Sequence, residues 1–194
     1  AGCEVNYLPV KEVRRLPEYS PTFITAIPDL LRVIGDLEFD NSLRFIRGAS
    51  SALPPNLYKQ LRYKFNIPVI EAFGMTEAMS HCFTNPLGGQ LRVGTVGLPD
   101  GIDARIVNGR LEIRGFNVAH KGWYDTGDLA EVDEAGYYKI LGRSKDQINI
   151  KGVKLNPLSL EKQLLETIPG LTECSIFGEE RVKCIFVGNG DKDA

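Results

Sequence analysis

The order of apolar and helical segments between residues 23 and 73 most constrains how this chain can fold. Three strand-like runs alternate with two helical patterns, at residues 23–27, 29–34, 43–48, 56–65 and 68–73. The second helical pattern follows Pro54-Pro55, and proline is tolerated in the first turn of a helix because an N–H there has no partner anyway. Strands that alternate with helices are typical of α/β units, so we predict parallel strands in this part of the chain.

The sequence changes character after Pro86, where glycines become frequent and apolar residues alternate with polar ones. Asn108-Gly109 joins two alternating runs, and this dipeptide is the strongest short signal for a β-hairpin. A second hairpin is predicted around the turn residues 133–136. Residues 92–141 are therefore predicted to be mostly antiparallel β structure.

A third region starts near Lys145 and combines strands with one helix. A short strand is predicted at 148–151, and Asn156-Pro157 then starts a helix that runs to Ile168, with the asparagine as its cap. Two alternating strands are predicted after it, within residues 173–177 and 182–187.

The composition of the 194 residues, of which 43% are hydrophobic, is that of a globular protein with enough apolar mass for a core. A net charge of −2 offers no attraction for nucleic acid, and no apolar run approaches the roughly 20 residues that span a membrane. The four cysteines form no C-x-x-C pair, and we expect Cys174 and Cys184 to be buried thiols in a reducing cytoplasm.

Three short polar motifs follow one another, at Phe73-Gly74-Met75-Thr76-Glu77, Tyr124-Asp125-Thr126-Gly127-Asp128 and Gly142-Arg143-Ser144-Lys145-Asp146. Each places charged or hydroxyl groups beside a glycine, where the backbone can approach a ligand closely. Hydroxyl and carboxylate groups suit phosphate oxygens and Mg²⁺, aspartate can accept hydrogen bonds from ribose hydroxyls, and arginine offers a rigid fork of donors. Together the motifs predict part of a nucleotide site.

Each motif also has a structural interpretation that needs no ligand. Thr76 and Glu77 suit the first turn of a helix, with the threonine as its cap, and taken alone a cap is the more common role. Residues 125–128 suit an Asx-turn between two strands, and Arg143 suits a solvated surface. From the residues alone, a plain α/β scaffold therefore stays open.

The order and spacing of the motifs resemble those of the adenylate-forming superfamily, which includes acyl-CoA synthetases, nonribosomal-peptide adenylation domains and luciferases. Residues 73–77 are similar to its aromatic-Gly-x-Thr-Glu motif, and residues 126–128 to its Thr-Gly-Asp motif. Further stretches that resemble superfamily elements are residues 48–53, 114–122 and 142–152. The resemblance covers nearly the whole chain, and it is stronger to acyl-CoA synthetases than to peptide-synthetase domains.

The resemblance implies roles for the matching residues. The nucleotide-binding residues that it implies are Ala49, Ser50, Ser51, Phe73, Gly74, Met75, Thr76, Asp128 and Arg143. The catalytic residues that it implies are Thr76 at the α-phosphate, Glu77 as the Mg²⁺ ligand and Lys145 as the hinge of a rotating C-terminal domain. Ser80 and His81 would line the acyl pocket, unless His81 only packs or faces solvent, and Gly152 would shape the thiol tunnel.

The activity implied by the resemblance has two half-reactions. A carboxylic acid and ATP first give acyl-AMP and pyrophosphate, and the acyl group then passes to a thiol, either CoA or a phosphopantetheine. The implied fold class is α/β. Residues 1–145 would be the end of a large N-terminal domain, with a βαβ unit and an antiparallel β subdomain, and residues 146–194 the start of a small α+β C-terminal domain.

The superfamily's phosphate loop and its C-terminal catalytic lysine have no counterpart in these residues. We therefore expect a partial chain, cut from a larger enzyme or reduced in evolution, that does not adenylate an acid alone. Core surface left exposed would favour self-association. The alternative from another functional class is a non-catalytic nucleotide-binding or interaction module that kept Asp128 and Arg143 but lost the chemistry.

Overall fold

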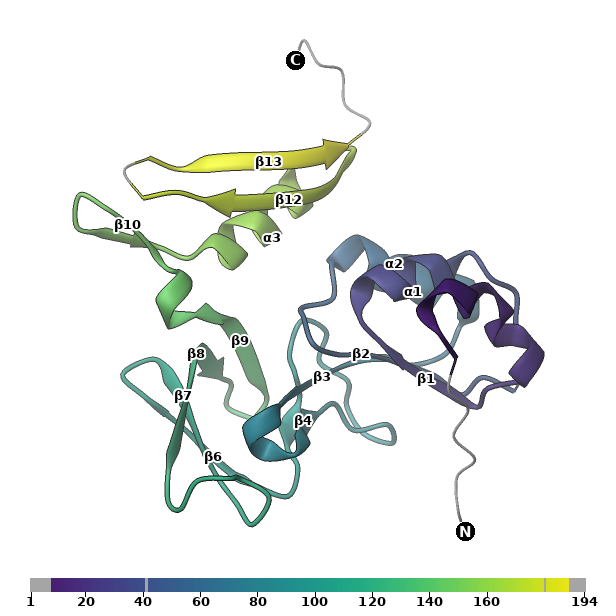
Figure 1. Ribbon diagram of the computed structural model, residues 1–194, viewed down its shortest axis with the longest axis horizontal. Helices are drawn as coiled ribbons and strands as arrows, with labels where there is room; N and C mark the ends of the chain where they lie inside the picture. The colour runs from purple at the N-terminus through teal and green to yellow at the C-terminus, as the bar shows by residue number, and fades with distance from the viewer. Residues whose placement is uncertain (1–7, 41, 180, 189–194) are drawn as a thin grey trace.

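The computed structural model describes residues 8–40, 42–179 and 181–188, and its elements fall into three groups along the chain (Figure 1). The first group is a five-stranded sheet in the order β1-β2-β3-β4-β5. Its strands are β1 (Phe23–Ala26), β2 (Phe45–Gly48), β3 (Val69–Met75), β4 (Ser80–Thr84) and β5 (Leu98–Pro99). The first three strands are parallel, as the sequence predicts, and β4 and β5 are antiparallel.

Helices cover one face of this sheet (Figure 1). They are the 3-10 helix η1 (Val10–Tyr19) and the α-helices α1 (Pro28–Gly35) and α2 (Pro55–Phe65). Leu31 of α1 and Leu57 and Leu61 of α2 are fully buried in one core together with Ile46 of β2. In α2, the four-residue spacing of its two leucines places both on the face that meets the sheet.

The sequence did not predict β4 and β5. Strand β3 continues to Met75, turns through the short 3-10 segment η2 (Thr76–Ala78) and returns as β4. Phe83 of β4 is fully buried directly opposite Phe73 of β3. This cross-strand packing stabilises β4, whose own sequence of Ser-His-Cys-Phe-Thr carries little strand signal.

The second group is a four-stranded antiparallel sheet in the order β6-β7-β8-β9, and it confirms the two predicted hairpins. Its strands are β6 (Asp103–Val107), β7 (Arg110–Arg114), β8 (Tyr124–Val132) and β9 (Tyr138–Arg143). Asn108 and Gly109 both have positive φ angles, as a tight two-residue turn requires. Leu111 and Ile113 of β7 are fully buried in a core that also contains Phe83, so this core joins the two sheets.

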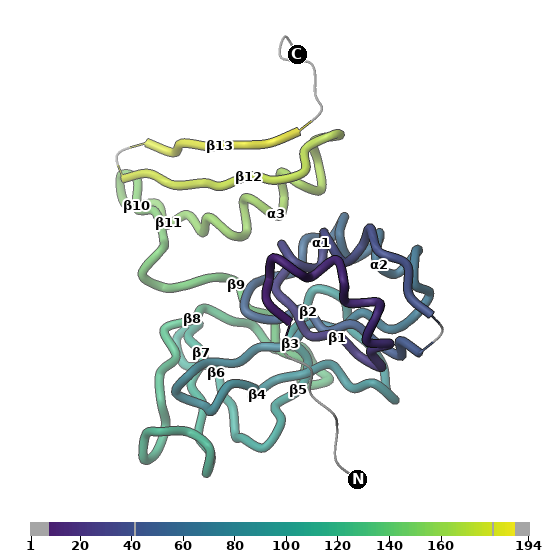
Figure 2. Tube along the Cα trace, turned by 45° about the vertical axis from the view of Figure 1, so that its right-hand side comes forward, coloured from purple at the N-terminus to yellow at the C-terminus, as the bar shows by residue number. Residues whose placement is uncertain are grey.

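The third group contains one helix and two small antiparallel hairpins. Its elements are η3 (Ser144–Asp146), β10 (Ile148–Ile150), β11 (Val153–Leu155), α3 (Pro157–Thr167), β12 (Leu171–Phe177) and β13 (Lys183–Gly188). Helix α3 starts as predicted, and the Asn156 side chain accepts a hydrogen bond from the Ser159 amide at 3.4 Å. Figure 2 shows α3 between the β12–β13 hairpin and the rest of the molecule.

Two polar contacts join the third group to the other two. The Asn156 side chain donates a hydrogen bond to the Leu141 carbonyl oxygen at 2.6 Å, next to the end of β9. Arg32 Nε of α1 lies 3.4 Å from Glu173 Oε1 of β12. The predicted domain boundary between residues 145 and 146 falls inside η3, and it stays a prediction.

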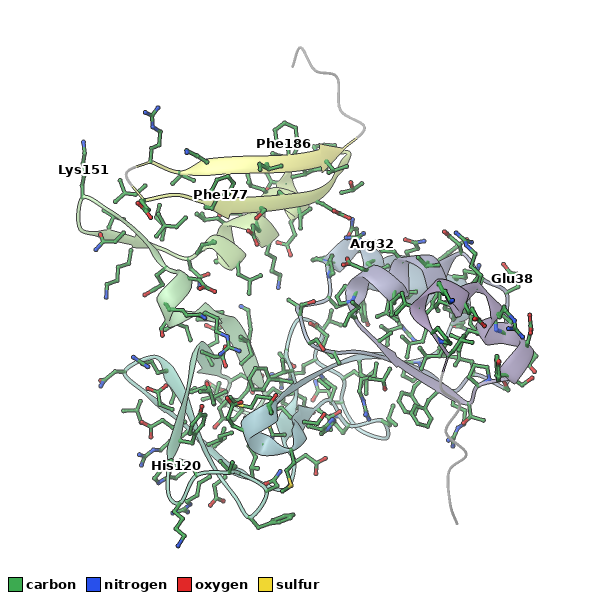
Figure 3. All side chains as sticks on the ribbon, viewed as in Figure 1. Arg32, Glu38, His120, Lys151, Phe177 and Phe186 are labelled. Carbon is green, nitrogen blue, oxygen red and sulfur yellow. The ribbon has the colours of Figure 1, made fainter. Side chains whose placement is uncertain are left out.

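Strand β13 leaves its side chains uncovered, and it forms the outer edge of the molecule in Figure 3. The prediction that Cys184 is buried was wrong, because the thiol lies on this exposed strand. Cys174 of β12 is half-buried, and its thiol donates to the Glu161 carbonyl oxygen of α3 at 3.4 Å. Helix α3 therefore covers β12 but does not protect β13.

Candidate functional site

The best-defined polar feature is an ion pair between two directly opposite residues of β8 and β9. Asp128 and Arg143 are register partners, and Asp128 Oδ1 lies 2.9 Å from Arg143 Nε. Arg143 Nη1 also donates to the Thr126 carbonyl oxygen at 3.1 Å. Both of the residues that the sequence analysis selected for the ribose are thus held together by strand pairing.

Asp128 is a buried carboxylate with one oxygen that is not satisfied. The residue is 2% exposed, and its Oδ2 atom has no hydrogen-bond partner within the described part of the chain. Burial raises the pKa of Asp128, although the charge of Arg143 and hydrogen bonding to Thr126 act in the opposite direction. A buried acceptor of this kind is costly unless a donor reaches it, and a hydroxyl group is such a donor.

The Asx-turn interpretation of residues 125–128 was partly wrong. The Gly127 amide does donate to Asp125 Oδ1, at 2.9 Å, but these residues lie within β8 and not between two strands. Gly127 has a φ angle of +76°, which glycine adopts without strain. The pairing of β8 with β7 is irregular over this stretch, between Asp125 and Leu129, and such bulges are a common way to aim a side chain.

The motif at residues 73–77 lies where β3 turns back into β4. A Cβ atom at Gly74 would overlap the backbone of Ser80, so the close approach of two strands requires glycine here. The helix-cap interpretation of Thr76 was wrong, because η2 is only three residues long and no side chain caps it. The exposed Thr76 and Glu77 side chains therefore stand at the tip of a tight strand–turn–strand unit.

The backbone of this turn is fixed by a second segment of the chain. The Ala119 amide donates to the Glu77 carbonyl oxygen at 2.7 Å, and the Asn117 side chain donates to the Ala78 carbonyl oxygen at 3.4 Å. The described residues contain no group of three or more side chains able to hold a metal ion.

Two predicted nucleotide-binding segments end neighbouring parallel strands. Ala49, Ser50 and Ser51 directly follow β2, and Phe73 to Thr76 complete β3 and begin the turn. Ligands of open α/β sheets bind outside the carboxyl ends of the strands, so both segments lie on the appropriate edge. The ring of Phe73 packs edge to face on Phe83, at 5.9 Å between centroids, and is half-buried.

The structure separates the remaining predicted residues. Ser80 and His81 begin β4, where His81 Nε2 lies 3.6 Å from Asp100 Oδ2. Lys145 is exposed in η3, and Gly152 lies in the turn between β10 and β11 with a φ angle of +86°. Lys145 and Gly152 thus belong to the third group of elements, whereas the other predicted residues belong to the first two groups.

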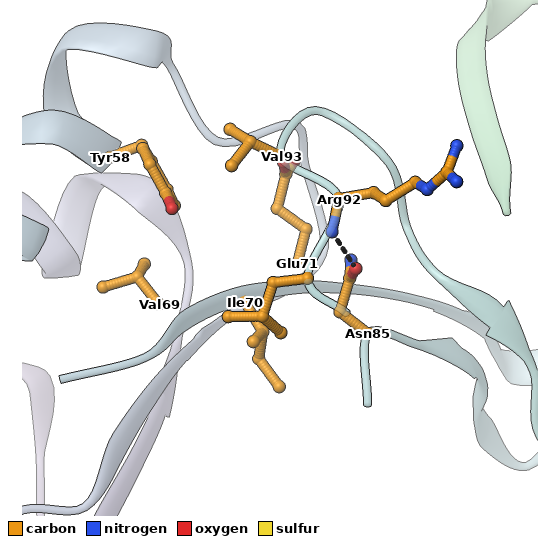
Figure 4. A pocket seen from close by; sticks show the side chains of 8 residues that line it. Tyr58, Val69, Ile70, Glu71, Asn85, Arg92 and Val93 are labelled. Carbon is orange, nitrogen blue, oxygen red and sulfur yellow. Dashed lines mark hydrogen bonds between the residues drawn. The ribbon is translucent and has the colours of Figure 1, made fainter. Parts of the chain in front are cut away.

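Glu71 is a polar residue that the sequence analysis missed. Its carboxylate accepts hydrogen bonds from the Leu53 amide at 3.1 Å and from the Gly94 amide at 3.2 Å. Burial raises its pKa, while the two amides and the charge of Lys162 lower it. The adjoining cavity, lined in part by Glu71 and Asn85, is only about 10 Å³ and holds at most one water molecule (Figure 4). Glu71 therefore holds the loops at Leu53 and Gly94 together by hydrogen bonds, and it does not line a ligand pocket.

The chain belongs to the family of AMP-binding enzymes, since the model of that family matches residues 1–119. The chain is 34% identical to the oxalate–CoA ligase of Arabidopsis thaliana, over 84% of this chain and 38% of that protein. It is 35% identical to the sulfoacetate–CoA ligase of Cupriavidus necator, over 70% of this chain and 32% of that protein.

The fold is shared with a solved structure. ATP-bound MatB from Rhodopseudomonas palustris matches with a TM-score of 0.81 and 25% identity, over 96% of this chain and 44% of that one. The α/β class predicted from the sequence is thereby confirmed. The chain spans less than half the length of each of these three proteins. Among the described residues, no helix is both long and apolar enough to cross a membrane.

Proposed function

We propose that this chain supplies the adenosine-binding half of an ATP-dependent ligase that activates a carboxylic acid as acyl-AMP and passes the acyl group to a thiol. The observation that carries the proposal is the Asp128–Arg143 pair, with a buried carboxylate oxygen that lacks a donor. Two adjacent ribose hydroxyls supply donors of the required kind. Membership of the AMP-binding enzymes supports this assignment.

The other residues have roles consistent with their positions. Phe73 would offer the exposed part of its ring to the adenine, whose edge would face residues 49–51. The Thr76 hydroxyl would donate to an α-phosphate oxygen. When bound at Glu77, Mg²⁺ would neutralise phosphate charge. The chain's contribution is therefore mainly to position the nucleotide for in-line displacement.

The reaction proceeds in two steps. A carboxylate oxygen attacks the α-phosphorus, the bond to the bridging oxygen breaks, and pyrophosphate leaves. A thiolate then attacks the acyl carbon, and AMP leaves. Rotation of residues 146–194 about Lys145 would replace the conformation that forms acyl-AMP by the conformation that transfers the acyl group. The same rotation would bring Gly152 to the thiol. CoA is the preferred acceptor because the relatives named above are CoA ligases, and a cytoplasmic setting would supply both ATP and CoA.

The acid that we favour is small and carries a second anionic group. Both relatives are named for acids of this kind, since oxalate has two carboxylates and sulfoacetate has a carboxylate and a sulfonate. Ser80 and His81 would lie beside such an acid.

The test is isothermal titration of AMP and of ATP with Mg²⁺ into the chain and into Asp128→Ala. We expect binding to the parent chain and its loss in the variant. Asp103→Ala is the matched control, because this exposed aspartate belongs to the same four-stranded sheet and pairs with Arg114. Equal binding by all three proteins, or none by the parent, would overturn the assignment of the site to this chain.

A further inference from the structure

A second group of charged side chains lies close to the proposed nucleotide site. Arg47 is on β2, His81 is on β4, and Asp100 directly follows β5. Gly48 faces the helices, since a Cβ atom there would touch Leu31 and Leu53. Successive residues of a strand point to opposite faces, so the side chain of Arg47 lies on the face of the sheet that the helices leave open.

Arg47 is a half-buried cation without a paired anion. Its guanidinium carbon lies 5.6 Å from the centroid of the Phe45 ring, and its Nε atom is buried without a hydrogen-bond partner among the described residues. Arg47 forms no ion pair within 4 Å in that part of the chain, although Asp100 is near enough for its charge to act on Arg47. Buried charges in proteins are normally paired, so this guanidinium has donors to spare for an anion.

His81 responds to the same charges. Burial lowers the pKa of His81, the positive charge of Arg47 lowers it further, and the charge of Asp100 raises it. Neutralising the guanidinium would therefore raise the pKa of His81, and the imidazole can itself donate to an anion. Arg47 and His81 lie on β2 and β4, the two strands that flank β3.

Arg47 and His81 both lie next to the proposed nucleotide site. Arg47 comes two residues before the 49–51 segment. His81 is the register partner of Gly74, and Gly74 comes two residues before Thr76. We propose that Arg47, assisted by His81, binds the second anionic group of a small acid whose reacting carboxylate faces Thr76. This assignment rests on the proposed function, which it extends by naming the residue that selects the acid.

A guanidinium suits this task better than a lysine would. Its planar fork donates two parallel hydrogen bonds to a carboxylate or a sulfonate, and it keeps its charge at any physiological pH. A monoanionic acid of the same size would leave the fork unused. The site should therefore discriminate between sulfoacetate and acetate, which differ by the sulfonate alone.

The experiment uses the two histidines of the chain as reporters. The imidazole pKa values of His81 and His120 are measured by NMR with sulfoacetate, and with acetate at equal ionic strength. An anion on Arg47 removes a positive charge that lowers the pKa of His81, so sulfoacetate is expected to raise this pKa. Acetate should leave it nearly unchanged, and His120 should respond to neither.

Arg47→Gln supplies the second arm. This variant should have a raised His81 pKa without ligand and should bind sulfoacetate about tenfold to a hundredfold more weakly. Arg44→Gln removes the same charge from an exposed position just before β2 and should behave like the parent. Equal responses to sulfoacetate and acetate, no response to either, or an unchanged response in Arg47→Gln would each overturn the proposal.

The two assignments fail in distinguishable ways. AMP binding that depends on Asp128, together with a His81 that ignores sulfoacetate, would remove the acid site and leave the nucleotide site. A sulfoacetate response that depends on Arg47, without AMP binding, would support an anion site at Arg47 and overturn the proposed function.

Discussion

At the scale of single residues, the Asp128–Arg143 pair buries a carboxylate, which costs stability, at the position where we propose that the ribose binds. The carboxylate is buried and its pKa is raised, so the ionised form is disfavoured in the folded protein. The partner arginine offsets part of this cost through one short contact. Such unsatisfied groups persist where function requires them.

We therefore predict that removing the arginine destabilises the protein more than removing the charge of the aspartate. Arg143→Gln should lower the free energy of unfolding by about 1–3 kcal/mol at neutral pH, because it leaves a buried carboxylate without its counter-charge. Asp128→Asn should stay within about 1 kcal/mol of the parent, because the amide carries no charge to bury. Urea unfolding followed by circular dichroism measures both values.

The double variant tests whether Arg143→Gln is destabilised by the unpaired charge of Asp128 or by the loss of side-chain packing at residue 143. Asp128→Asn combined with Arg143→Gln should recover most of the stability that Arg143→Gln loses, because no buried charge remains. Additive losses would show that the charge of Asp128 is not the cause. The size of the penalty should also depend on pH: because the pKa of the Asp128 carboxyl is raised, the penalty is absent in acid and appears as the pH rises through that pKa. The defect of Arg143→Gln should therefore shrink at low pH.

The sequence identified some of these residues for the right reason and others for the wrong one. Asp128 and Arg143 were selected from motifs, and strand register places them opposite each other. Gly74 was selected because glycine lets a ligand approach, whereas the structure shows that Ser80 of the neighbouring strand is what approaches. Glu71 was missed because its partners, the Leu53 and Gly94 amides, are distant in sequence.

At the scale of elements, Asn156 connects α3 to the four-stranded sheet. Its side-chain oxygen caps the helix, and its amide nitrogen donates to the Leu141 carbonyl oxygen. One residue thus fixes both the start of the helix and its attachment to the chain just before η3.

Two substitutions at Asn156 should separate these functions. Asn156→Ala should destabilise α3 by about 1 kcal/mol or more, since it loses the cap and the attachment. Asn156→Asp keeps an oxygen for the cap but places it against the Leu141 carbonyl oxygen, so the attachment alone is lost. Amide hydrogen exchange should show faster exchange at the start of α3 only in the alanine variant. Fast exchange there in both variants would contradict this division of roles.

Elements with a local signal were predicted well. The first three strands, the two α-helices of the first group and the Asn108-Gly109 hairpin all depend on proline, glycine or apolar spacing within a few residues. Strands β4, β5 and β11 were missed because they owe their place to pairing with other strands. The helix-cap interpretation of Thr76 failed for the same reason, since the continuation of the chain as β4 leaves no room for a helix.

At the scale of the whole molecule, the third group of elements exposes an apolar strand. Ile185, Phe186 and Val187 of β13 are 63%, 68% and 58% exposed. Lys183 is the only charged residue of this strand, and an apolar edge strand with a single charge at its start is a favourable surface for pairing with a second copy. We therefore expect that any self-association of the chain occurs through β13.

We predict that Phe186→Lys reduces self-association of the chain, because it places a charge in the middle of the exposed strand. Sedimentation velocity at several concentrations measures the effect. Phe116→Lys is the control, since Phe116 is 93% exposed but lies outside this strand. A parent chain that stays monomeric at all concentrations, or an equal effect of both substitutions, would contradict the assignment to β13.

The turn that carries Thr76 and Glu77 has a consequence for how this protein can vary during evolution. It is held by the Gly74–Ser80 approach on one side and by hydrogen bonds from Asn117 and Ala119 on the other. A single inserted or deleted residue between 75 and 79 would break the β3–β4 register, because side chains alternate along a strand. Changes in length should therefore accumulate in the exposed segment at 87–89, which ends just before the Gln90 carbonyl oxygen that accepts a hydrogen bond from Tyr137.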